Sequence, residues 1–303
     1  MSSLHMPSNW FGRGCILIIA LATGLRANEP ADALSSDIAP ATAGPAKHRL
    51  FPLMSARMRE EIQKRGRELP PPYGVMALGN WLDSDWDFLS ASVSLSDSPY
   101  VDIPAGETAT MDLQSTTVGF KADVWVLPFV DLMIGGGRAD IDANLNLFDV
   151  PVSFSPGQGV TRGDKIVPMK FDGEYYSFGF VIAGAYKKFY GAIDASWIKT
   201  QLNGDASLSA DGFWTLTVSP KIGYNAGMTQ FYIGARYLSK NEHYVGTVPL
   251  ASGQTLGFDV QIETASWAPN FGIRTVVREH WEVLVECAFS TRRQITAGVG
   301  YRW

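Results

Sequence analysis

The stretch that decides the fold is Gln294-Ile295-Thr296-Ala297-Gly298-Val299-Gly300-Tyr301-Arg302-Trp303. Its apolar and aromatic residues occupy every second position from Ile295 to Trp303, and the positions between them are polar or glycine. Successive side chains of a β-strand point to opposite faces of the sheet, so this period of two predicts a strand with one apolar face and one polar face. Such a strand can contact lipid on one side and a hydrated space on the other.

The same alternation recurs upstream, which indicates that strands make up most of the chain. Trp281, Val283 and Val285 alternate with Glu282 and Glu286, and residues 117–126 and 214–225 behave in the same way. Weaker versions of the pattern cover residues 130–147, 175–186, 189–201, 230–240 and 261–277, with a bulge expected at Pro269. A first strand is expected within residues 85–95, and residues 73–82 form either its lead-in or an additional short strand.

The lengths of the connections between these segments support a barrel. Short connections are expected at residues 127–129, 187–188, 225–229 and 278–280. Longer ones are expected at residues 96–111, 148–173, 202–212 and 241–260, with a shorter hairpin at 291–293. Outer-membrane barrels have short periplasmic turns and longer external loops. We therefore expect an all-β fold, a transmembrane antiparallel up-and-down β-barrel of about ten strands, with eight or twelve as alternatives.

A soluble β-sandwich, or an internally filled barrel of a secreted protein, would also bury one apolar face. The membrane barrel is favoured by the combination of strands of about ten residues, loop lengths that alternate, and aromatic residues near strand ends. Those aromatic residues are Trp125, Tyr186, Tyr190, Trp197, Tyr224, Trp281, Tyr301 and Trp303.

The N-terminal residues predict export. Arg13 precedes an apolar run from Cys15 to Leu25, which suits a signal peptide over residues 1–27 with cleavage between residues 24 and 33. A short buried helix of a cytosolic protein is the alternative. Residues 28–72 are expected to form a periplasmic tether with one short amphipathic helix at 50–69, or a partly ordered linker, and residues 73–303 the barrel.

The closing stretch, residues 294–303, resembles the terminal strand of Gram-negative outer-membrane β-barrel proteins, in which a final aromatic residue is read by the barrel-assembly machinery. The resemblance implies a location in the bacterial outer membrane, with outer-membrane lipid and the barrel-assembly machinery as partners. It also implies that Val299, Tyr301 and Trp303 form the membrane-insertion signal, with tryptophan in place of the more frequent phenylalanine. These ten residues indicate the export route and the architecture but not the activity.

Charged residues on the polar faces of the strands are expected to face the lumen. They are Lys121, Asp123, Asp194, Lys199, Lys221, Arg236, Arg274, Glu282, Glu286 and Arg302. Both signs occur in similar number, so the side chains can pair across a small lumen and fill it. We therefore expect a closed or very narrow passage rather than a wide channel.

Several classes of function are disfavoured by the sequence. The formal net charge of -5 lacks the basic footprint of a nucleic-acid-binding protein. No metal site or cofactor is expected, because the histidines are scattered and no lysine of a phosphate-binding loop follows Gly135-Gly136-Gly137. His243 could join Ser239, Glu242 or Asp205 in a hydrolase, although a surface histidine in a hydrated loop is the expected reading.

The function we expect is therefore non-catalytic: a narrow channel, or the transport or binding of small or apolar solutes. The alternative is a structural or adhesive barrel that acts through external loops at residues 148–173 and 241–260. A barrel hydrolase that uses His243 is the third hypothesis.

Overall fold

The computed structural model describes Leu53 and residues 71–87, 90–96, 98–103, 109–155, 159–204, 208–210, 212–249, 253–290 and 292–303. The signal peptide, the tether and the helix expected at 50–69 lie outside these residues, apart from Leu53, Pro71 and Pro72. The Leu53 amide donates to the Val126 carbonyl at 3.1 Å. Within the described part of the chain, no helix is long and apolar enough to cross a membrane.

All the strands belong to one antiparallel sheet. They are β1 (Tyr73–Asp87), β2 (Ser90–Leu95), β3 (Val101–Ile103), β4 (Ala109–Leu127), β5 (Val130–Ser155), β6 (Gly159–Tyr186), β7 (Phe189–Gly204), β8 (Leu208–Ala210), β9 (Phe213–Ala226), β10 (Thr229–Pro249), β11 (Thr255–Val277), β12 (Trp281–Ala288) and β13 (Arg292–Arg302).

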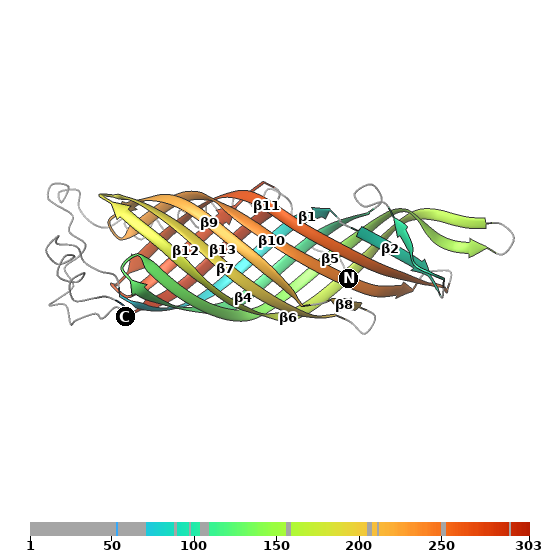
Figure 1. Cartoon of the computed structure of the whole chain (residues 1–303), viewed down its shortest axis with the longest axis horizontal. Coiled ribbons are helices and arrows are strands. Elements are labelled where there is room, and N and C mark those ends of the chain that lie inside the picture. The colour runs from blue at the N-terminus through green and yellow to red at the C-terminus, as the bar shows by residue number, and fades with distance from the viewer. Residues whose placement is uncertain are drawn as a thin grey trace.

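The sheet closes into a barrel (Figure 1). The ring runs β1-β4-β5-β6-β7-β9-β10-β11-β12-β13 and returns to β1, because β13 pairs with β1 from Gly74↔Arg302 to Ser84↔Arg292. The sheet has 13 strands in the described residues, more than the number expected from the sequence. The additional ones are β2, β3 and β8, which have three to six residues each and lie outside the ring.

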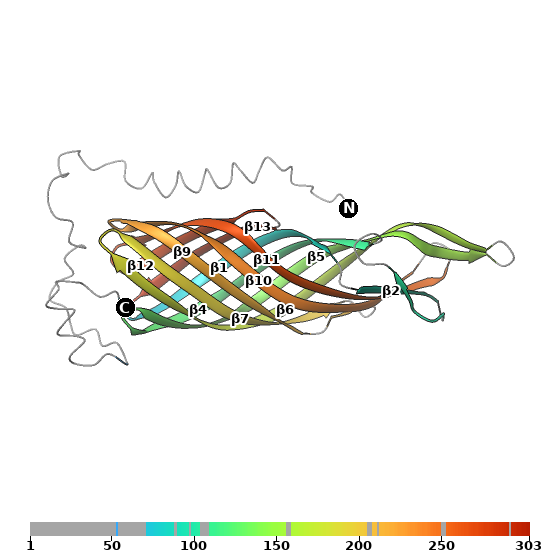
Figure 2. The same ribbon diagram turned by 45° about the horizontal axis from the view of Figure 1, so that its top comes forward.

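One end of the barrel carries tight turns at 128–129, 187–188, 227–228 and 278–280, as the sequence predicted. Lys187, Arg278 and Glu279 have φ values of 53°, 50° and 66°, and Gly227 has 65°, so the last three of these turns use the left-handed region. The C-terminal Trp303 lies at this end (Figure 1). At the opposite end, β5 and β6 continue as a hairpin beyond the other strands (Figure 2).

Strand β1 starts at Tyr73. Residues 73–82 are therefore part of a strand and not merely a lead-in to a first strand within residues 85–95. Strand β1 pairs with β13 only as far as Ser84, and β2 then pairs with β11 from Ser90↔Gln261 to Leu95↔Leu256. The β12–β13 hairpin is short, with β12 ending at Ala288. Above that hairpin, β2 therefore takes its place beside β11.

Proline perturbs the ladder at a different place from the one expected. The β10–β11 register runs without a shift through Ala235↔Pro269, so the bulge predicted at Pro269 is wrong. The interruption lies on the other edge of β10, where paired positions jump from Gly234↔Lys221 to Tyr237↔Val218 across Pro220. Proline has no N–H group to donate, which accounts for the gap.

Near the tight turns, the outward side chains are apolar and the inward ones are charged. Phe120 and Val118 on β4 are 71% and 63% exposed, and Ile134 on β5 is 66% exposed. The intervening Lys121 and Asp123 point into the barrel. A closed ring with a solvent-exposed apolar exterior is the architecture of a transmembrane barrel, because closure leaves no unpaired strand edge in the hydrocarbon.

Further along the same strands the pattern inverts. On β4 the outward residues become Gln114 and Asp112, while the inward Leu113 and Met111 are 1% and 0% exposed. This inversion extends around the barrel and encloses an apolar core that we call the external core. It comprises Ala91, Val93, Leu95, Met111, Leu113, Ile141, Ala143, Leu145, Leu147, Val150, Val167, Met169, Phe171, Leu202, Phe213, Tyr244, Leu256, Phe258, Val260 and Ile262.

The external core corrects the expectation of long external loops. Most of residues 148–173 and 241–260 belong to β5, β6, β10 and β11. These segments do alternate, but their apolar positions face inward, as Val167, Met169 and Phe171 do on β6. Where the barrel extends beyond the lipid, its outer surface meets water and is polar. Its apolar side chains are therefore buried inside the barrel, where their removal from water stabilises this part of the fold.

Candidate lumen chamber

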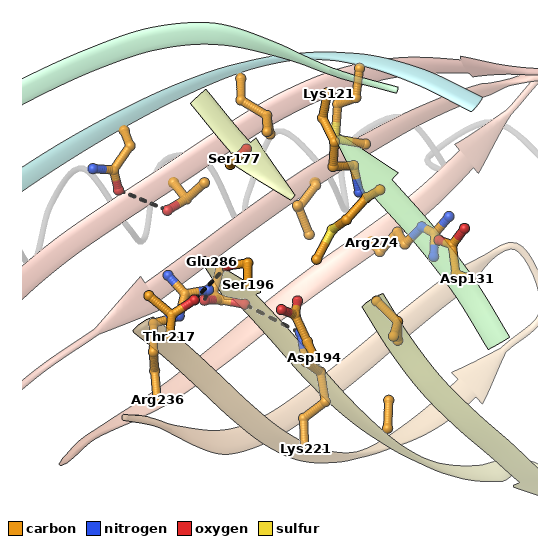
Figure 3. Close-up of a pocket in the computed structure, with 18 of the residues that line it drawn as sticks. Lys121, Asp131, Ser177, Asp194, Ser196, Thr217, Lys221, Arg236, Arg274 and Glu286 are labelled. Carbon is orange, nitrogen blue, oxygen red and sulfur yellow. Dashed lines mark hydrogen bonds and ion pairs between the residues drawn. The ribbon is translucent and has the colours of Figure 1, made fainter. Parts of the chain in front are cut away.

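The interior of the barrel contains a chamber of about 1080 Å³ between the tight-turn end and the external core. Strands β1, β4, β5, β6, β7, β9, β10, β11, β12 and β13 all contribute side chains to its wall. Figure 3 shows charged and hydroxyl side chains from several of these strands pointing into it. A volume of this size is comparable to that of small-molecule sites.

The floor of the chamber, at the tight-turn end, contains two ionic clusters. In the first, the Arg302 guanidinium contacts the Asp123 carboxylate and lies 3.9 Å from Asp131 and 3.5 Å from Glu282. Arg274 also contacts Glu282, and the Lys121 ammonium lies 3.7 Å from Asp123. This cluster joins β11, β12, β13, β4 and β5, which follow one another around the ring with β1 between β13 and β4, so it ties these strands together at the tight-turn end.

The second cluster surrounds Glu286 on β12. Its carboxylate contacts Arg236, accepts a hydrogen bond from the Tyr232 hydroxyl at 2.7 Å and lies 3.9 Å from the Lys221 ammonium. Lys221 also faces Asp194 at 3.7 Å, as Figure 3 shows. Glu286 is only 4% exposed. A charged carboxylate that is buried to this extent requires cationic or hydrogen-bonding partners to offset the loss of its hydration.

The structure places nine of the ten charged residues expected in the lumen on the inner face and brings them into these two clusters. Lys199 is the exception, because it lies on the outer face of β7. Its ammonium donates to the Gly212 carbonyl at 2.6 Å and lies 5.7 Å from the ring centre of Trp214. Asp194, Ser196, Ile198 and Thr200 line the chamber instead, and a residue at odd spacing from them must face the other way.

Sequence reasoning missed four participants. Asp131 and Tyr232 belong to the clusters described above. Lys240 and Glu242 form a further inward pair at 2.8 Å, near the external core. Each of the four lies an even number of positions from an inward-facing residue on the same strand: Asp131 from Met133, Tyr232 from Arg236, and Lys240 and Glu242 from Leu238. Strict counting by two along each strand would therefore have found them.

His243 contacts Asp259 on the outer surface, and Asp205, one of the residues proposed to join it in a hydrolase, lies outside the described residues. The His243 Nε2 lies 2.8 Å from Asp259 Oδ1, whereas Glu242, next in sequence, points inward and is 1% exposed. On the same outer surface, Lys170 bonds Asp142, and this hydrogen bond raises the pKa of the lysine. Among the described residues, no group of three or more His, Cys, Asp or Glu side chains is arranged to hold a metal ion.

The glycine run at 135–137 contributes to the wall. A Cβ on Gly135 would lie 2.8 Å from the Ser177 hydroxyl and 2.9 Å from the Phe120 carbonyl oxygen. On Gly137 it would lie 2.2 Å from the Val118 carbonyl oxygen. These positions therefore permit close approach of β5 to β4 and β6, the structural role that the sequence indicated.

No protein-family model and no curated protein sequence matches this chain. Solved structures with some similarity include the outer membrane protein OprG from Pseudomonas aeruginosa, with 12% identity, 77% of this chain and 98% of that chain covered, and a TM-score of 0.42. The translocator domain of the autotransporter NalP from Neisseria meningitidis has 10% identity, coverage of 81% and 93%, and a TM-score of 0.38. The Ralstonia pickettii toluene transporter TbuX has 10% identity, coverage of 77% and 90%, and a TM-score of 0.34. At these values, the similarities do not assign a function.

Proposed function

We propose that this chain is a non-catalytic bacterial outer-membrane barrel that binds small apolar solutes in the lumen chamber. The observation that carries the proposal is the chamber itself, about 1080 Å³ of space inside the barrel, bounded at one end by the external core. A solute held there is separated from lipid by the barrel wall. Concave sites that combine apolar contact with placed polar groups are the usual sites of small-molecule binding.

The two ends of the chamber differ in chemistry. At the tight-turn end, Arg302 and Glu286 anchor the two ionic clusters on the chamber wall. At the external end, buried side chains such as Leu145, Leu256 and Phe258 pack across the barrel. The external core leaves no continuous hydrated path through the barrel, so the proposed function is solute binding and slow transfer rather than steady ion conduction.

The proposed location rests on the outward face. Val299 and Tyr301 on β13, and Trp303 directly after it, lie on the outward side, with 49%, 36% and 51% of their surfaces exposed. This side is available to lipid and, during insertion, to the barrel-assembly machinery that the resemblance of the closing stretch implies. Tyr73 stacks beside Trp303 with ring centres 6.2 Å apart, which suits an aromatic girdle at the membrane interface.

Two measurements on purified protein in lipid test the proposal. In planar bilayers we expect no steady single-channel steps, and in nanodiscs we expect saturable binding of 2-ethylnaphthalene above that of empty discs. The variant Ser177→Trp places a large side chain in the chamber and should abolish the binding. Thr116→Trp, on the outer face of β4, is the matched control and should retain it. Steady conductance, or binding that survives Ser177→Trp, would contradict the proposal.

A second candidate function, adhesion, is favoured by the β5–β6 hairpin that extends beyond the other strands (Figure 2). Ile166 and Phe148 on this hairpin are 63% and 39% exposed in the part of the barrel with a polar exterior. The double variant Ile166→Ser, Phe148→Ser discriminates the two functions. Loss of surface attachment with unchanged solute binding would support adhesion as an additional role.

A further inference from the structure

The polar groups of the chamber are arranged in layers along the strands. On β4 the inward residues run from Leu113 through Ser115 and Thr117 to Lys121. On β9 they run from Phe213 through Thr215 and Thr217 to Lys221. Both strands therefore pass from apolar to hydroxyl to charged as they approach the tight turns.

The middle layer forms a hydroxyl belt. We define it as Ser115, Thr117, Ser177, Ser196, Thr215 and Thr217, all of which line the chamber. Figure 3 shows Ser196 and Thr217 beside the second ionic cluster and Ser177 farther from it.

Some hydroxyl groups of this belt have no side-chain hydrogen-bond partner among the described residues. Ser196 and Thr217 bond each other at 2.6 Å. For Ser115, Thr117, Ser177 and Thr215, no side-chain hydrogen bond occurs among the described residues. Each hydroxyl can donate once and accept twice, so the belt can bond a polar group of a solute.

The belt lies among small and apolar side chains. Ser115 is paired across the sheet with Ile141 and Leu82, and Thr117 is paired with Ala139. Lys240 lies opposite Thr215, but it is bonded to Glu242 at 2.8 Å. The surface presented to a solute at this level therefore combines apolar contact with neutral hydrogen-bonding groups.

The ionic floor offers little to a charged solute, because its carboxylates already have cationic partners. Asp194 lies 3.7 Å from Lys221, and Asp131 lies 3.9 Å from Arg302. A buried Arg292 donates to the Arg236 carbonyl at 2.9 Å and is not among the residues lining the chamber. An ion that entered as far as these clusters would lose its hydration without gaining an unoccupied counter-charge from their carboxylates.

We infer that the chamber selects uncharged compounds that combine an apolar body with one hydroxyl or carbonyl group. The polar group bonds the hydroxyl belt, and the body packs toward Leu113, Ile141 and Phe213 at the external end. This inference rests on the proposed function and narrows it to a class of solute.

A series of four naphthalenes of similar size tests the inference by calorimetry on the full chain in nanodiscs, with empty discs subtracted. They are 2-naphthylmethanol, 2-ethylnaphthalene, 2-naphthoate and 2-naphthylmethylammonium. We expect the alcohol to bind at least about tenfold more tightly than either ion, because burial of an unpaired charge costs more than burial of a bonded hydroxyl.

The triple variant Thr117→Val, Ser177→Ala, Thr215→Val removes three belt hydroxyls with little change in volume. It should weaken binding of the alcohol by about 5- to 30-fold, the effect of one or two hydrogen bonds, and leave 2-ethylnaphthalene binding unchanged or stronger. Thr116→Val, on the outer face of β4, is the matched control and should change neither. Heat-modifiable gel migration verifies folding, and if the triple variant does not fold, Thr117→Val alone should weaken alcohol binding by about fivefold.

The outcomes separate this inference from the proposed function. If 2-ethylnaphthalene binds but an ion matches the alcohol, or the belt variants bind the alcohol as tightly as wild type does, the inference is wrong and the proposed function stands. Equal loss of the alcohol and of 2-ethylnaphthalene also contradicts it. If none of the four compounds binds, both fail.

Discussion

Replacement of Ile134 by lysine tests whether the inversion of polarity along β5 marks the edge of the membrane. Ile134 points outward and is 66% exposed, so in water this substitution would be nearly neutral. It lies five residues above Phe129 in the tight turn, about 17 Å along a strand tilted by about 40°, which gives a height of about 13 Å. That is the middle of an apolar band about 25 Å tall.

A lysine at this depth should lower the free energy of unfolding from lipid by about 2 to 4 kcal/mol. Asn144→Lys is the matched control, because it lies on the same strand and the same face but about 38 Å above the turn, outside the band. The assay is urea unfolding in vesicles, followed by the gel migration of folded protein. If Ile134→Lys costs less than about 0.5 kcal/mol, or if both variants cost the same, the placement of the membrane is wrong.

Three further predictions concern the floor, the external core and the outer surface. Arg302→Met should destabilise the barrel by about 3 to 5 kcal/mol in the same assay, because it strands buried carboxylates, and adding Asp123→Asn should recover about 1 kcal/mol or more. Full stability of the single variant would contradict the stabilising role of the Arg302 cluster. Phe258→Ala should cost about 3 to 5 kcal/mol, since the side chain is fully buried, and a cost near zero would show that the external core is not packed. His243→Ala should leave protease, lipase and acyltransferase readings at the wild-type background; a loss of activity would instead reveal a hydrolase.

Alternation by two identified the barrel because lipid and lumen impose opposite demands on neighbouring side chains. It found the tight turns, and it placed Glu282, Glu286 and Arg302 on the inner face, where the structure pairs them. Lys199 was misplaced because residue type was weighed above parity. It lies five positions from Asp194, and in a regular strand the two cannot share a face.

The external core was not predicted because each strand was expected to face lipid on its outer side along its whole length. Val167, Met169 and Phe171 alternate as regularly as Phe120 and Val118 do, but with the opposite orientation. Periodicity gives the two faces of a strand but not which of them meets solvent. Contacts between the two ends of the chain, such as Arg302 with Asp123 on either side of Gly74, are separated by 179 positions and depend on barrel closure, which a single strand does not specify.

At the external end, the single strand β2 lies beside β11, where the β12–β13 hairpin lies lower in the barrel. Barrel diameter grows roughly in proportion to strand number, so a wall in which one strand replaces two of ten narrows by about a tenth. The wider part of the barrel contains the chamber, and the narrower part contains the external core. Under the proposed function, a bound solute therefore exchanges with the outside only when the side chains of the external core move apart.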